Sequence, residues 1–472
     1  MTAALDQPIA EASARRRLPP KPAPAKAILP APLAIWALRK NMLATWGQLA
    51  YELSVVSRPF LGRQSILLND PALIRHVLVD NHDAYGRTAA GIRILEPITG
   101  KGLFLSEGAQ WKRQRRLMAP AFAPRNLGFV AEASLAEAER YLDGLGASRS
   151  KAVDLLHAFQ GISLEIACRV LLSQSMDSHG SALRRLITRY GRRHARPSAF
   201  DLLLPDDWRS PDDFGRRRFA REWRSLVDGI VAERAARPPP ATPADLFDAM
   251  RRATLESAGS PTGGQAADAF GPEELRDQIG TLIVAGHETT ALALFWSSYL
   301  LATHPEAQDA LAVEAGAADL SPAGIAEAAH ALPMARAVVS EALRLYPPAF
   351  TLVREARRPD RLGDVEVGQG AIVVIAPWVL HRHKQHWVDP DSFRPERFLP
   401  GATPPERFTY LPFGAGPRVC IGAQFALTEA AVVLARLVRD CRIELVGRRP
   451  IQPVGIITIY PDRPPPFRLV PR

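Results

Sequence analysis

One cysteine of this sequence lies in a loop whose composition suits a metal-bound thiolate. The loop Phe413–Gly422 reads FGAGPRVCIG and precedes a predicted helix over residues 423–439. A cysteine thiol has a pKa of about 8.5, so a thiolate ligand needs a positive field around it. We expect the N-terminus of the following helix to supply part of that field at Cys420. Gly416 and Gly422 are predicted to permit tight turns and close packing.

Two other side chains of this loop suit a flat, acidic ligand. Phe413 can pack against a planar group, and Arg418 can pair with an acid at its edge. The alternative is a glycine-rich turn with a structural cysteine. The pattern F-x-x-G-x-R-x-C-x-G is expected on the order of 10⁻⁴ times in a chain of this composition, which favours a functional loop. Cys168 and Cys441 show no CxxC spacing, so neither a disulfide framework nor a zinc site is predicted.

A second set of candidates lies in the middle of a long predicted helix, residues 271–304. Its segment Ala285–Thr290 reads AGHETT, and the HExxH zinc pattern fails at its last position. The alternative is a core helix with a small-residue kink. A buried carboxylate is costly unless it is paired or used, so Glu288 is a functional candidate. Ala285 and Thr289 are four residues apart and therefore face the same way.

The elements that must position these residues are mostly helical. The chain has 472 residues, of which 47% are apolar and 23% charged, as in a globular protein with a large core. Periodicity predicts a mainly α fold without a linker that divides it, and the few strands gather near the two ends. Predicted helices cover much of 111–234, then 271–304, 332–345 and 423–439, and predicted strands cover 64–68, 371–376 and 456–460.

The N-terminal segment and the net charge bear on location and partners. Residues 1–40 are predicted to be a flexible, proline-rich leader, and residues 41–472 to form one domain. Neither a signal peptide nor a run of about 18–20 apolar residues is visible, so we expect a cytoplasmic protein without a membrane anchor. The net charge is +10, and the basic residues match no nucleic-acid-binding motif. An acidic protein partner is therefore favoured over nucleic acid.

The loop around Cys420 resembles the haem-binding signature of the cytochromes P450. In that family the cysteine supplies the thiolate ligand of the haem iron. The resemblance implies a P450 fold, with one large helical domain, a small β-rich lobe and haem b between the long helix and the cysteine loop. It also implies that Ala285 and Gly286 lie over the haem. Glu288 and Thr289 match the family's acid–alcohol pair, which relays protons during oxygen activation.

The resemblance also identifies an expected structural triad. Glu341 and Arg344 match the family's E-x-x-R pair, which binds a third arginine behind the haem. The sequence PERF occurs twice, and the first copy follows Phe393 to give the full FRPERF. Arg397 is therefore the expected third member, and Arg407 in the second copy is expected at the surface.

Further motif positions imply haem and substrate contacts. Trp111 and Arg115 resemble the family's W-x-x-x-R pair, and Arg354 matches another position that meets a haem propionate. Together with Arg418 they would supply donors for the two propionates. His381, His383 and His386 are expected in a polar surface loop rather than as metal ligands. The resemblance suggests a largely aliphatic substrate pocket formed by Ile92, Ile98, Phe104, Ala285, Phe350, Leu352 and Ile456.

The implied function is a haem-thiolate monooxygenase that inserts one atom of O2 into a hydrophobic small molecule. Electrons are expected from NAD(P)H through a separate reductase and a ferredoxin or flavodoxin. This partner is predicted to dock near Lys112, Arg113 and Arg116, and the enzyme is expected to be a monomer. One alternative is a peroxygenase, isomerase or dehydratase of the same fold. Another is a non-enzymatic haem sensor or carrier.

Overall fold

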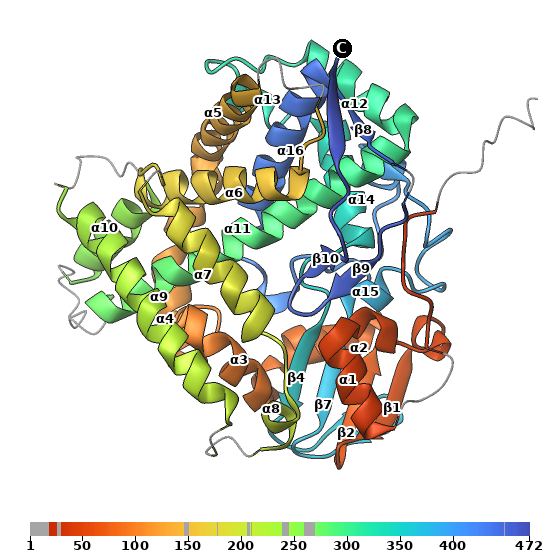
Figure 1. Ribbon diagram of the computed structural model, residues 1–472. Coiled ribbons are helices and arrows are strands. Elements are labelled where there is room, and N and C mark those ends of the chain that lie inside the picture. Colours follow the sequence, from red (N-terminus) through yellow and green to blue (C-terminus); the bar gives the residue numbers. More distant parts are fainter. Residues whose placement is uncertain are drawn as a thin grey trace, which may run out of the picture.

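The longest helix, α11 (Pro272–Thr303), runs through the centre of the molecule (Figure 1). The computed structural model describes residues 18–25, 30–145, 151–176, 178–204, 208, 210–237, 245–258, 270–447 and 449–472. As predicted, α11 begins with a proline at its first position and with Glu273 and Glu274 at the positive end of its dipole. Leu292, Leu294 and Phe295 are fully buried, each worth about 1.5–3 kcal/mol. The helix thus anchors the core.

Other helices surround α11, in agreement with the predicted mainly α fold. Its main neighbour is α6, and α14, α16, α3 and α9 also pack against it. The predicted helices over 332–345 and 423–439 are present as α14 and α16. The described helices besides α11 are α1 (Ala31–Asn41), α2 (Pro71–Arg75), α3 (Ala89–Thr99), α4 (Gly108–Met118), α5 (Leu127–Leu145), α6 (Leu155–Leu172), α7 (Gly180–Arg193), α8 (Ala199–Leu203), α9 (Asp212–Ala235), α10 (Leu246–Ala258), α12 (Pro305–Ala317), α13 (Ile325–Ala328), α14 (Pro333–Leu345), α15 (Pro377–Leu380) and α16 (Ala423–Asp440).

The largest sheet lies beside the helices at the bottom of the view in Figure 1, and the other described strands form three separate pairs. A five-stranded sheet has the order β1-β2-β7-β4-β3, in which only β2 and β7 are parallel among the described pairs. The predicted strands at 64–68 and 371–376 are these two neighbours. The strands of this sheet are β1 (Val55–Phe60), β2 (Arg63–Leu68), β3 (Tyr85–Gly86), β4 (Leu352–Ala356) and β7 (Ile372–Ile375), and β5 (Asp360–Leu362) pairs with β6 (Val365–Val367).

The C-terminal strands differ from the prediction. The single strand expected at 456–460 is instead a hairpin of β9 (Pro453–Gly455) and β10 (Ile459–Pro461), whose turn interrupts the apolar run. Trp296 on α11 donates its indole N–H to the carbonyl of Ile459 at 2.9 Å, which ties the hairpin to the central helix. The last strand is β11 (Phe467–Pro471), paired with β8 (Cys441–Leu445).

Part of the segment expected to be a flexible leader is folded. Helix α1 occupies residues 31–41, so the expected boundary at residue 40 falls inside a helix. Farther upstream, Lys21 pairs with Asp391 and the Pro20 carbonyl accepts a hydrogen bond from Tyr346. Residues 1–17 lie outside the described residues.

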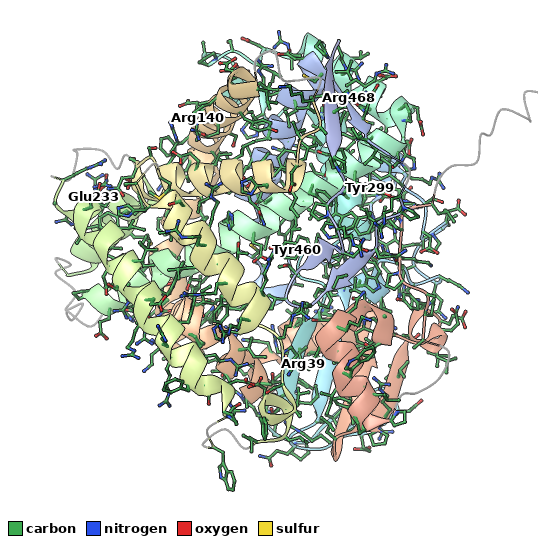
Figure 2. The ribbon with its side chains drawn as sticks, in the orientation of Figure 1. Arg39, Arg140, Glu233, Tyr299, Tyr460 and Arg468 are labelled. Carbon is green, nitrogen blue, oxygen red and sulfur yellow. The ribbon has the colours of Figure 1, made fainter. Side chains whose placement is uncertain are left out.

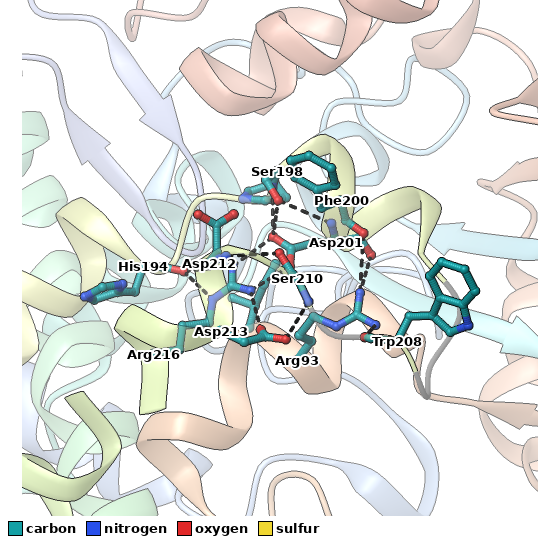
Figure 3. A network of polar contacts seen from close by, with 12 residues as sticks. Arg93, His194, Ser198, Phe200, Asp201, Trp208, Ser210, Asp212, Asp213 and Arg216 are labelled. Carbon is teal, nitrogen blue, oxygen red and sulfur yellow. Dashed lines mark hydrogen bonds and ion pairs between the residues drawn. The ribbon is translucent and has the colours of Figure 1, made fainter. Parts of the chain in front are cut away.

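A buried polar network joins α3, α8 and α9 (Figure 3). Arg216 of α9 makes a bidentate ion pair with Asp201 of α8, at 2.6 and 2.8 Å. Asp201 also completes a capping box with Ser198 at the start of α8. Arg93 of α3 donates to the carbonyls of Asp201 and Trp208, at 3.3 and 3.2 Å. The network thus holds together α3, α8 and α9, three helices that are separated in the sequence.

Two helices, α6 and α11, are long and apolar enough to cross a membrane by length and composition. In each, 67% of the apolar window is buried inside the domain. Such burial is typical of core helices, which pass the same test because their whole circumference is apolar.

Candidate active site

The cysteine loop is held by backbone contacts in front of α16. The N–H of Cys420 donates to the carbonyl of Phe413 at 2.9 Å, which closes the loop. The side chain of Phe413 packs against the main core, and that of Cys420 is solvent-accessible. The loop therefore presents its sulfur outward from a rigid base.

Opposing effects act on the protonation of Cys420. Protein atoms surround the accessible side chain on most sides, and this desolvation raises the pKa of the thiol. A hydrogen bond from the Gly422 N–H at the start of α16, together with the positive charge of Arg115, lowers the pKa in part. The expected positive field is present, but without a metal it does not outweigh burial. A bound cation would complete the stabilisation of the thiolate.

The two glycines of the loop have different roles. Gly416 has a φ of +72°, and a Cβ there would lie 2.0 Å from the carbonyl oxygen of Leu78. No other residue fits without moving the backbone. At Gly422 φ is −92°, and a Cβ would lie 3.7 Å from the ring of Phe122, an ordinary contact. The tight packing expected at both positions is needed only at Gly416, and Gly422 acts through its N–H.

The middle of α11 combines an exposed face with a bonded hydroxyl. Ala285 is exposed, although Ile283 and His287 on either side of it are buried. The Thr289 hydroxyl donates to the Ala285 carbonyl at 2.6 Å, a contact that tends to bend a helix locally. Gly286 lies toward α6, where a Cβ would meet the Ala167 side chain at 3.7 Å. Ala285 and Thr289 thus share the accessible side, as predicted from their spacing.

Glu288 faces the C-terminal hairpin. Its Oε1 accepts hydrogen bonds from the hydroxyls of Tyr460 and Thr458, the latter at 3.3 Å. Burial raises the pKa of Glu288, and these two bonds oppose the rise only in part. The next side chain, His287, is buried, which lowers its pKa to about 4 and keeps the ring neutral near pH 7. Glu288 is therefore a carboxyl group of raised pKa, next to Thr289 in the chain.

Three arginines gather near the cysteine loop. Burial and repulsion from Arg354 and Arg418 lower the pKa of Arg87 to about 9. Burial and Arg418 lower the pKa of Arg354 to about 10. The Nε of Arg87 is buried and has no hydrogen-bond partner within the described ranges. Arg418 lies over the ring of Trp111, at 4.7 Å from its centroid, and donates to the carbonyl of Ser106. The cluster brings three positive charges close together, and their repulsion favours a bound anion.

The basic residues of α4 point in several directions. Arg115, expected at a propionate, lies within electrostatic range of Cys420. Arg113, expected in a docking surface, pairs with Glu274 of α11 and lies over Phe270. Lys112 is exposed.

These residues fit haem b. Cys420 presents a thiol on an accessible face, and Ala285 exposes the middle of the central helix. The half-buried cationic cluster of Arg87, Arg354 and Arg418 would be neutralised by two carboxylates, the number that haem carries. The donor set therefore suits an iron porphyrin with an axial thiolate and two propionates.

The three residues of the expected triad, Glu341, Arg344 and Arg397, lie in contact in the structure. Arg344 donates to both carboxylate oxygens of Glu341 at 2.7 Å, and both side chains are fully buried. The Nε of Arg397 lies 3.5 Å from Glu341 Oε1, and the same side chain donates to the carbonyls of Val388 and Asp389. Arg344 also donates to three backbone carbonyls, so the triad fixes the segment before the cysteine loop. Arg407 is exposed, as expected.

The expectation of a polar surface loop for three histidines is wrong. His381 and His383 are fully buried and His386 is partly buried. His381 accepts the Leu411 N–H at 2.8 Å, and burial lowers its pKa to about 3. The other two contact backbone carbonyls, at Leu53 and Asn69. They connect the lobe to the core, and no metal cluster is found among the described residues.

The expected pocket residues divide into two groups. Ile98 and Phe350 are buried in the main core, and Phe350 packs against Gly455. The others are at least partly accessible and keep their place as candidate walls: Ile92, Phe104, Ala285, Leu352 and Ile456.

Two site residues were not predicted. Arg87 belongs to no motif, and its place beside Arg354 depends on the pairing of β3 with β4. Tyr460 was treated as a strand residue, and its contact with Glu288 depends on the fold of the hairpin. An apolar strand ending in tyrosine near the C-terminus was the only available signal.

Comparisons with known proteins agree with this geometry. A family model described as Cytochrome P450 matches residues 31–460. Cyclooctatin synthase of Streptomyces melanosporofaciens is 32% identical over 409 residues, which are 85% of this chain and 84% of the relative. The chloroplastic carotene epsilon-monooxygenase of Arabidopsis thaliana is 28% identical, over 84% and 76% of the two chains.

The crystal structure of the cytochrome P450DA heme domain shares the fold. Its TM-score is 0.77, with 22% identity, over 96% of this chain and 98% of that chain. The family match covers most of the sequence, including Cys420, the Glu288–Thr289 pair and the triad. The chain belongs to the cytochrome P450 family, and it is a haem-thiolate monooxygenase of that family.

Proposed function

We propose that the enzyme inserts one atom of O2 into a hydrophobic small molecule, with electrons that a separate protein delivers. The observation that carries this proposal lies in the middle of α11. There the Thr289 hydroxyl shares an accessible face with Ala285, next to the half-buried Glu288 with its raised pKa. When bound, haem supplies oxygen activation at an iron that carries a thiolate ligand. Relatives of this fold that act as peroxygenases, isomerases or dehydratases often lose the acid–alcohol pair, so the presence of Glu288 and Thr289 argues against those reactions.

Each group of site residues would have a distinct role in this reaction. Cys420 would ligate the iron, while the Gly422 N–H and Arg115 stabilise its negative charge. Arg354 and Arg418, joined by Arg87, would hold the propionates. Glu288 would release a proton toward the Thr289 hydroxyl, which can accept and donate at the same oxygen. The triad would keep the cysteine loop in register.

The electrons would come from NAD(P)H through a reductase and a ferredoxin or flavodoxin. Lys112 and Arg116, both exposed on α4, remain candidates for an acidic partner, whereas Arg113 is engaged by Glu274. Charge-steered docking weakens with ionic strength because salt screens exposed charges. The first-electron transfer rate should therefore fall steeply with added salt. A rate indifferent to salt would remove this docking surface.

The substrate proposed is largely apolar. The accessible candidate walls contain only aliphatic and aromatic side chains, and the charge nearest to Phe104 is Arg87, which belongs to the arginine cluster. One relative is named for acting on a carotene, a hydrocarbon. A screen for substrate-induced spin-state change in the Soret band should therefore begin with carotenes, terpenoids, steroids and fatty acids.

The test of the proposed reaction is Thr289→Ala. With a compound from that screen and a surrogate ferredoxin and reductase, the variant should consume NAD(P)H but release mostly peroxide instead of product. Thr290→Ala, one residue along and buried, is the matched control and should keep its product yield. Full coupling in Thr289→Ala would favour a peroxygenase or another reaction on this fold.

A further inference from the structure

A polar chain from three elements meets at Glu288. Tyr460 of β10 and Thr458 in the hairpin turn both donate to Glu288 Oε1 on α11. The side chain of Gln160 on α6 in turn hydrogen-bonds Tyr460. Tyr460, which is half-buried, is labelled near the middle of the view in Figure 2. The half-buried carboxyl of Glu288 thus has two neutral hydroxyl donors.

The hairpin that carries these donors is fixed in place. Trp296, two turns beyond Glu288 on α11, holds the carbonyl of Ile459 at 2.9 Å. Asn41 accepts the Gly455 N–H at 2.9 Å and donates to the Pro453 carbonyl at the same distance. The Tyr460 hydroxyl is therefore presented by a braced strand and not by a loose terminus.

The two members of the acid–alcohol pair bind different partners. The Thr289 hydroxyl donates to the Ala285 carbonyl on the accessible face, whereas the Glu288 carboxyl contacts the hairpin. Successive helix residues point about 100° apart, which follows from 3.6 residues per turn. Glu288 must therefore rotate away from the hairpin to reach Thr289, and in doing so it gives up its bond with Tyr460.

We propose that Tyr460 is a positioning residue for Glu288, holding the carboxyl against the C-terminal hairpin and so controlling its transfer of a proton to Thr289. Thr458 supports the same bond at longer range. This inference rests on the proposed monooxygenase reaction, in which Glu288 supplies that proton. The proton moves from the Glu288 carboxyl oxygen to the Thr289 hydroxyl oxygen while that hydroxyl passes its own proton to the acceptor on the accessible face. The carboxylate left behind on Glu288 is the form that Tyr460 stabilises best.

The charged and titratable groups around the Glu288 carboxyl determine in which direction its pKa should shift when a donor is removed. Arg192 of α7 acts on Tyr460, and Arg184 of the same helix acts on His287, which is neutral near pH 7. Within the described part of the chain, the two hydroxyl donors are the groups that favour the charged form of Glu288. Removal of either donor should raise the pKa of Glu288 further.

The experiment follows Glu288 by infrared spectroscopy in the ferric, substrate-free holoenzyme. The carboxylic-acid C=O band is assigned by its loss in Glu288→Gln and is then titrated with pH. In Tyr460→Phe the midpoint of this titration should move to higher pH. In Thr458→Val it should move in the same direction by less, because that bond is longer at 3.3 Å. The valine variant keeps the test open should Tyr460→Phe fail to fold.

The control is Tyr346→Phe, which removes another buried phenol hydroxyl, one that donates to Pro20 at 2.9 Å. Its midpoint should equal that of the wild type. An unchanged midpoint in both hairpin variants would overturn the proposal, even if Thr289→Ala uncouples the reaction. A shifted midpoint together with full coupling in Thr289→Ala would instead retain the Tyr460–Glu288 link and refute the proposed reaction.

Discussion

The buried pair of Asp201 and Arg216 gives the sharpest stability prediction. Arg216 is 2% exposed and Asp201 1%, and two charge-assisted bonds of 2.6 and 2.8 Å join them. Burial alone would raise the pKa of Asp201, but the bonds from Arg216 and Ser198 hold it below its usual value. The stabilisation is therefore present at neutral pH and is lost as the pH falls through the pKa of the folded state.

Asp201→Ala leaves the charge of Arg216 buried. Removing one partner of such a pair costs about 3–5 kcal/mol. Arg216 keeps longer contacts, to the His194 carbonyl at 3.2 and 3.3 Å and to Asp213 at 3.4 Å. The loss in free energy of unfolding should therefore lie at the lower end of this range, at about 3 kcal/mol. This corresponds to roughly a hundredfold change in the equilibrium between folded and unfolded protein.

The measurement is urea unfolding followed by circular dichroism, with amide exchange of α8 and the first turns of α9 as a local readout. Asp212→Ala is the control, because this exposed acid at the start of α9 should cost less than about 1 kcal/mol. The double variant Asp201→Leu with Arg216→Met should recover most of the loss. A loss in Asp201→Ala no larger than in Asp212→Ala would refute the reasoning.

Two further predictions concern the cysteine loop and the acid limb of stability. Gly416→Ala should abolish stable haem binding in a pyridine-haemochrome assay, because the new Cβ would lie 2.0 Å from the Leu78 carbonyl oxygen. Gly422→Ala is the control and should retain its haem. Equal haem retention in the two variants would contradict the role given to Gly416. Asp360 accepts bonds from His76 and Tyr85, which lower its pKa to about 2 against the effect of burial. The stabilisation by Asp360 is fully present above the unfolded-state pKa of about 4 and is lost as the pH falls toward 2. In Asp360→Asn the free energy of unfolding should therefore fall less steeply with decreasing pH over this range. An acid limb identical to that of the wild type would show that Asp360 is not responsible.

Local signals in the sequence predicted the central helix well. Pro272 and the acids after it gave the start of α11, and Pro305 gave its end, because capping depends on neighbours in the chain. The family resemblance also placed Glu341, Arg344 and Arg397 together, which the E-x-x-R spacing alone could not do because it recurs elsewhere in the chain.

Features that depend on tertiary pairing were beyond the sequence. The run IITIY carries no alternation, so the turn between β9 and β10 follows from the contacts of Gly455 and Ile459 with α1 and α11. The same hairpin brings Tyr460 to Glu288. Arg87 comes close to Arg354 only through the pairing of β3 with β4. The histidines at 381 and 383 looked like surface residues because burial of a polar run requires partners that the run does not reveal.

The central claim is that Cys420 is the thiolate ligand of a haem iron. The most direct test is the absorption spectrum of the dithionite-reduced, CO-bound protein, compared with that of Cys420→Ser. The wild type should show the red-shifted Soret band of thiolate ligation, and the variant should lose it while keeping any haem that it binds by its arginine cluster. A wild-type spectrum without that band, or a variant that retains it, would contradict the assignment of Cys420.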